Sequence, residues 1–159
     1  TYFTSDELHL GEISLECSRA GASAVALWAT QRLMPLVPHG EFAENLNASR
    51  RAAMWLSGKI TGSPRFMLPF RPELDIVVWA PAGESASAMS TSSVHIFKAL
   101  EAEGVHLAVA KLPREILSRA WPHITWDQDH VTCLRSCLMK PEHLEWIDTI
   151  WEKIQGVTY

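Results

Sequence analysis

Few residue patterns in this chain match a motif for catalysis or metal binding. The run GKIT at 58–61 has the ending of a phosphate-binding loop, but Ala53 stands where that motif needs its first glycine. The seven histidines show no metal-ligand spacing, and none pairs with a cysteine at zinc-finger distance. Cys133 and Cys137, four residues apart in a predicted strand, would lie on one face about 13 Å apart, too far to share a metal. Thr1 has the hydroxyl of an N-terminal nucleophile, but a threonine left by cleavage is the simpler interpretation.

The composition is that of a folded domain. The chain has 159 residues, of which 47% are hydrophobic and 20% charged, enough for one domain with a sizeable core. A formal net charge of -4 does not favour nucleic-acid binding, which needs a basic face. No apolar run approaches the roughly 18 residues of a membrane span, and no signal peptide is visible, so we expect neither nucleic-acid nor membrane partners.

Two further features suggest where the chain works and how it arises. Its three cysteines are too few and too scattered for a disulfide scaffold, and they favour a reducing cytoplasm. The chain begins with Thr1 instead of methionine, so we expect a processed, cleaved or truncated product.

Hydrophobic periodicity predicts an α+β fold. Ala-, Leu- and Trp-rich stretches predict two helices at 20–34 and 40–56, with Trp28 packed between them and Gly58 as a C-cap of the second. The second half predicts short strands, then a helix, two strands and a final helix that begins at Pro141. This order favours a small, mostly antiparallel sheet with helices on one face. The segments are strands at 66–70, 75–80, 105–112 and 131–139 and a helix at 92–103.

Three motifs, in order along nearly the whole chain, resemble the group II pyridoxal-phosphate-dependent amino-acid decarboxylases. The first is TYF at 1–3, similar to the family's mobile catalytic loop. The second is GEISLECSRAGA at 11–22 followed by ALW at 26–28, similar to a Ser/Gly-Arg pair before a long helix. The third is CLRSCLMKP at 133–141, similar to the family's last strand, with Lys140 in place of the usual asparagine.

The resemblance implies the C-terminal part of a fold type I enzyme. We expect residues 1–60 to hold a remnant of the catalytic loop and the helices that end the large cofactor domain. Residues 61–159 would form the small C-terminal α+β domain. The family's cofactor lysine directly follows a histidine, and no His-Lys pair occurs here. Since the cofactor acts as the electron sink, the chain alone should be inactive, with pyridoxal 5'-phosphate bound mainly by a missing upstream domain.

The resemblance also implies roles for four residues, each with a simpler alternative. Tyr2 matches the loop tyrosine that protonates the substrate carbon, and otherwise is a frayed terminal aromatic residue. Ser18 and Arg19 match positions near the cofactor phosphate and the mouth of the active site. Their alternatives are a helix N-cap for Ser18 and an ion pair with Glu16 for Arg19. Arg135 matches an arginine that binds the substrate carboxylate in glutamate decarboxylases, and otherwise forms a buried structural salt bridge.

The sequence therefore predicts a C-terminal portion of an amino-acid decarboxylase, a carboxy-lyase. Its partners would be an amino-acid substrate, the N-terminal cofactor-binding portion of the same enzyme and a second subunit in a homodimer. One alternative is another lyase or an aminotransferase-like enzyme on the same fold. Another is a non-catalytic interaction or assembly module. The residues do not select the substrate, because every amino acid carries an α-carboxylate.

Overall fold

The computed structural model describes residues 21–158. These residues fall into two compact units, with the boundary between Ala43 and Glu44. The first contains α1 (Ala22–Leu33), none of whose residues is buried. Trp28 is 59% exposed, and the Arg32 guanidinium carbon lies 5.1 Å from the centroid of its ring. Within its own unit, Trp28 is therefore not packed in a core, and its expected packing against the following helix stays a prediction.

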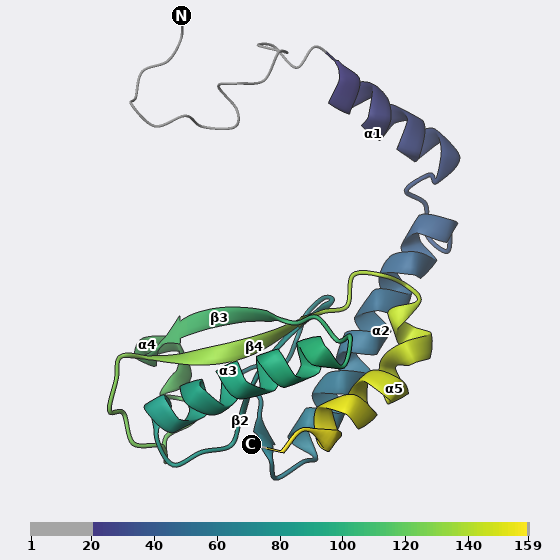
Figure 1. Ribbon diagram of the computed structural model, residues 1–159. Coiled ribbons are helices and arrows are strands. Elements are labelled where there is room, and N and C mark those ends of the chain that lie inside the picture. Colours follow the sequence, from purple (N-terminus) through teal and green to yellow (C-terminus); the bar gives the residue numbers. More distant parts are fainter. Residues whose placement is uncertain (1–20, 159) are drawn as a thin grey trace, which may run out of the picture. The chain divides into compact units, whose positions relative to one another are not determined.

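The second unit is a four-stranded antiparallel sheet in the order β1-β2-β4-β3 (Figure 1). This arrangement confirms the predicted α+β class. A short helix, α4 (Arg114–Leu117), between β3 and β4 was not predicted. The strands are β1 (Phe66–Met67), β2 (Ile76–Pro81), β3 (Ala108–Pro113) and β4 (His130–Cys137). The long helices are α2 (Glu41–Thr61), α3 (Ala86–Ala102) and α5 (His143–Gly156).

Two helices differ in length from the prediction for local reasons. Gly58 lies inside α2 and does not cap it, because the helix continues to Thr61 and Gly62 N–H bonds Gly58 O at 3.0 Å. Helix α3 begins six residues before position 92, at a serine-rich stretch that lacks a helical pattern. There the Ser85 side chain accepts a hydrogen bond from Ala88 N–H at 3.2 Å and caps the helix.

The long helices cover one face of the sheet. Successive side chains of a strand point to opposite faces, so Leu134 and Arg135 of β4 face opposite ways. Leu134 belongs to the larger hydrophobic cluster, which also contains buried residues of α2, α3 and α5 (Figure 1). We call this side the helix face. Trp79 on β2 is fully buried there, and its ring meets Phe66 edge-on at 5.1 Å.

The opposite face, which we call the open face, is covered only in part. Val131 and Cys133 of β4 are fully buried in a second cluster, to which the start of α3, Leu117 of α4 and Trp121 of the following loop contribute. Towards the C-terminal end of β4 this cover ends, and Ile76 on β2 is 41% exposed.

Candidate functional site

Arg135 occupies the middle of the open face. The register places it between Val78 on β2 and Ala108 on β3, and the next row pairs Ile76 with Cys137. A strand on either side fixes the backbone of Arg135, and its two neighbours in this row have short side chains. A rigid central strand is a better support for a binding side chain than a loop.

The Nε atom of Arg135 is buried and has no hydrogen-bond partner among the described residues. No ion pair to Arg135 is found in residues 21–158 either. The alternative of a buried salt bridge therefore has no support in the part of the chain that the structure describes. Leaving a buried donor unpaired costs on the order of 1–3 kcal/mol, more when the group is charged.

Arg65 shows how this fold uses an arginine for structure. Its two terminal nitrogens donate to the carbonyl oxygens of Gln155 and Val157, where α5 ends. A cation at a helix C-terminus complements the unpaired carbonyls there. Arg135 has no comparable set of acceptors, and its planar fork matches the two oxygens of a carboxylate.

Cys133, two residues before Arg135 on the same face, is not a candidate nucleophile. It is fully buried, and burial raises the pKa of its thiol to about 12. The thiolate is the reactive form of a cysteine, so this side chain acts as a small apolar group in the core. Cys137 is also a free thiol.

The N-terminus of α3 is already occupied by a carboxylate of the chain itself. Asp127 accepts a hydrogen bond from Ser87 N–H at 3.0 Å and another from the Ser87 hydroxyl. These hydrogen bonds lower the pKa of Asp127. With Ser85 as N-cap, the free N–H groups of this helix end are used internally, so the site does not favour a phosphate.

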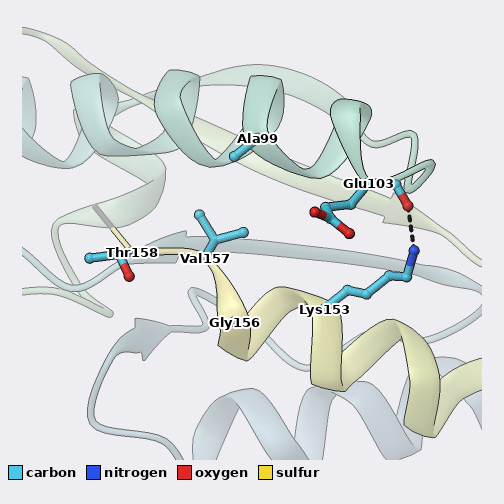
Figure 2. Close-up of a pocket in the computed structure, with 6 residues that line it drawn as sticks. All are labelled: Ala99, Glu103, Lys153, Gly156, Val157 and Thr158. Atoms are coloured by element: carbon cyan, nitrogen blue, oxygen red, sulfur yellow. Dashed lines mark hydrogen bonds between the residues drawn. The ribbon is translucent and has the colours of Figure 1, made fainter.

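The C-terminus of α3 borders a cavity of 330 Å³, and the lysine that lines this cavity has a structural partner (Figure 2). The Lys153 ammonium donates to the backbone oxygen of Glu103, the C-cap residue. Gly104 follows in the left-handed region at φ 77, and the bonds Val105 N–H to Leu100 O and Gly104 N–H to Glu101 O complete a Schellman motif. Lys153 therefore stabilises the helix end.

Most of the lysines among residues 21–158 have exposed side chains. Lys59, Lys98, Lys111 and Lys140 are exposed, and Lys153 bonds the end of α3. The Lys59 Nζ atom lies 4.7 Å from the centroid of the Trp55 ring, which is a contact within one helix. None of these lysines directly follows a histidine, as the cofactor lysine of the group II decarboxylases is expected to do.

Of the four predicted site residues, the structure describes only Arg135. Tyr2, Ser18 and Arg19 lie outside the described residues. In residues 21–158 no cluster of His, Cys, Asp or Glu could hold a metal ion. No helix in the same range has the length and apolar character to cross a membrane.

Relatives of this chain are found through structure and not through sequence. No family model matches it, and no curated protein matches it. Among solved structures, 4-hydroxyphenylacetaldehyde synthase from Rhodiola rosea matches with a TM-score of 0.62 and 14% identity over 83% of this chain. Tryptophan decarboxylase from Catharanthus roseus, in complex with L-tryptophan, matches with a TM-score of 0.57 and 14% identity over 83% of this chain. A third match is the glutamate decarboxylase domain of a diaminobutyrate-pyruvate transaminase and L-2,4-diaminobutyrate decarboxylase from Vibrio parahaemolyticus, at 0.53 and 15% over 82%.

These likenesses confirm the expected fold, that of the C-terminal part of the group II decarboxylases. The chain covers 25%, 25% and 24% of the three structures, so it spans about a quarter of their length. At such identities the likeness concerns the fold, and a fold alone does not specify a reaction.

Proposed function

We propose that this chain is the C-terminal portion of a pyridoxal-phosphate-dependent amino-acid decarboxylase. Arg135 is the observation that carries the proposal. In a fold shared with decarboxylases, it is a cation with a buried, unpaired donor on the sheet face opposite the larger hydrophobic cluster. Its role would be to bind a carboxylate of the amino-acid substrate, and a charged hydrogen bond of this kind contributes about 1.5–3 kcal/mol.

The other site residues complete the proposal from the sequence motifs. Tyr2 would donate a proton to the substrate carbon once the loop has closed and excluded water. Ser18 and Arg19 would lie at the cofactor phosphate and the mouth of the site. The upstream portion of the enzyme would hold pyridoxal 5'-phosphate, because no lysine of this chain directly follows a histidine.

The experiment begins with the residues encoded directly upstream of Thr1. A His-Lys pair there, about one hairpin away, supports the proposal, whereas a start codon supports the non-catalytic module. The chain including those residues is then assayed for carbon dioxide release from a panel of amino acids. Absence of release from every amino acid, in protein loaded with cofactor, would refute the decarboxylase.

A second candidate is a related reaction on the same fold. It is favoured by the Rhodiola rosea structure, because that protein is named an aldehyde synthase. Product analysis separates the two candidates, since a decarboxylase yields an amine and an aldehyde synthase an aldehyde.

The isolated chain should not bind the cofactor covalently. We expect no lysine to be labelled when the chain is incubated with pyridoxal phosphate, reduced with borohydride and digested for mass spectrometry. Stoichiometric labelling of one lysine would contradict the proposed division between this chain and the upstream portion.

Self-association follows from the apolar side chains of α1. Val25, Leu27, Trp28 and Leu33 are each at least 59% exposed, and a large exposed apolar patch marks an interface. We propose a homodimer, so sedimentation velocity at micromolar concentration should show a dimer or larger species. Leu27→Glu should reduce association, whereas Ile116→Glu, at a similarly exposed site in the other unit, should not. A clean monomer of the native chain would refute this.

A cytoplasmic location remains part of the proposal. Its support is the sparse cysteine content, together with the free thiols of Cys133 and Cys137.

A further inference from the structure

A second cavity, of 480 Å³, lies where the α3–β3 loop, the end of β4 and the start of α5 meet. The α3–β3 loop is distant in the sequence from the other two segments, which follow one another, so no spacing pattern indicates the cavity. Arg135 does not line it. The lining residues that matter below are Val105, His106, Leu107, Lys140, His143 and Trp146.

The polar part of the lining is cationic or hydrogen-bond donating. It contains Lys140 and two histidines but no aspartate or glutamate, in a chain whose net charge is -4. The Nδ1 atom of His143 accepts a hydrogen bond from Lys140 N–H at 3.3 Å. Because Nδ1 accepts, the other ring nitrogen, Nε2, carries the proton and is a donor.

The Lys140 side chain is available to a ligand. Lys140 is exposed, and its ammonium has no partner among the described residues. Lys153 contrasts with it. It lines the adjoining 340 Å³ cavity, but its ammonium bonds Glu103 O. Lys140 thus supplies a positive charge to this lining, and within residues 21–158 its ammonium has no structural role.

Trp146 provides a flat apolar wall. It lines both adjoining cavities and is 57% exposed, with the His143 ring 6.5 Å away by centroid at an interplanar angle of 65°. The buried residues of α5 are Ile147, Trp151 and Ile154. Packing of the helix therefore does not require an indole at position 146, and an exposed aromatic ring in a concave surface favours a flat ligand.

We propose that this cavity binds a small aromatic carboxylate. The ring would pack on Trp146 against the apolar wall of Val105 and Leu107. The carboxylate would accept hydrogen bonds from Lys140 and His143 Nε2. This inference does not depend on the proposed decarboxylase function, because it uses none of that site's residues.

Calorimetric titration of the chain with 2-naphthoate and with 2-naphthamide tests the proposal. The two probes have nearly the same shape, and only the first is charged. We expect 2-naphthoate to bind with one site per chain and 2-naphthamide to bind more weakly. Equal affinity for both, or no binding of 2-naphthoate at millimolar concentration, would overturn the proposal.

Two pairs of variants locate the site. Trp146→Ala should weaken the binding of 2-naphthoate about 2- to 12-fold. Trp28→Ala, at a site that is 59% exposed, should have no effect on this binding. Lys140→Glu should weaken the binding of 2-naphthoate about 2- to 10-fold and leave the binding of 2-naphthamide unchanged. Lys111→Glu is the control, because it makes the same charge change outside the cavity.

Equal melting midpoints of the four variants would exclude misfolding as the cause. The proposal fails if Trp28→Ala weakens binding as much as Trp146→Ala. It also fails if the two charge reversals have the same effect on 2-naphthoate, since attraction by net charge would then explain the binding.

Discussion

Arg135 and Ser136 are neighbours on β4, but their side chains lie on opposite faces of the sheet and differ in hydrogen bonding. The Ser136 hydroxyl, on the helix face, accepts a hydrogen bond at 3.0 Å from the Trp79 indole N–H, and both side chains are buried. Arg135, on the open face, has a buried Nε without an acceptor. The Trp79–Ser136 pair on the helix face is therefore satisfied, whereas Arg135 on the open face keeps a donor unpaired.

This difference indicates that the helix face serves the stability of the fold and the open face serves binding. The helix face joins the sheet to α2, α3 and α5 through one apolar cluster, so its residues are needed for folding. The open face keeps a costly unpaired cation where less of the chain packs over it. Such a cost is expected where a ligand completes the hydrogen bonding.

The largest effect is expected on the helix face. Trp79→Ala should lower the free energy of unfolding by about 3–5 kcal/mol, because it leaves a large cavity beneath three helices. Urea denaturation of the chain measures this. Val109→Ala on the edge strand β3 is the control, since Val109 is 47% exposed and should cost less than about 1 kcal/mol. A similar loss in both variants would contradict the division between the faces.

A substitution on the open face should change activity and not stability. Arg135→Met, made in the complete enzyme, should lower kcat/KM about 10- to 150-fold, because one charged hydrogen bond to substrate is lost. The free energy of unfolding should change by less than about 1 kcal/mol, since no described carboxylate is left unpaired. A destabilised variant with normal activity per folded molecule would instead indicate a structural salt bridge.

Ser136→Ala tests the hydrogen bond on the helix face. It should cost about 1–3 kcal/mol, because the buried Trp79 N–H loses its acceptor. The same substitution in a Trp79→Phe background should cost less, since no donor remains to be satisfied. Equal costs in the two backgrounds would show that the bond does not stabilise the fold.

The smallest effect concerns pH and Cys133. Its folded-state pKa of about 12 lies above the ordinary value of 9.0, so the unfolded chain loses the proton first. The resulting stability is complete below pH 9 and is lost as pH rises from 9 towards 12. At pH 10 the loss is about 1.4 kcal/mol relative to neutral pH. Urea midpoints at pH 7 and 10 should differ less in Cys133→Ala, and an equal decline in both proteins would refute this origin.

The sequence predicted the elements whose pattern is local. The apolar run around Arg135 predicts β4, and the apolar spacing after Pro141 predicts α5 with Trp151 on its buried face. Trp151 is 7% exposed. The start of α3 could not be predicted in the same way. There the serines gain partners from Asp127, forty residues along the chain.

For the candidate site, the sequence by itself determined that a charge lies in an apolar strand and therefore needs a partner. Only the tertiary structure decided that residues 21–158 contain no such partner, because pairing depends on which side chains the sheet brings within hydrogen-bond distance. The cavity at Trp146 has the same origin. Its walls come from three segments that meet only when the helix face packs, so neither composition nor spacing determines it.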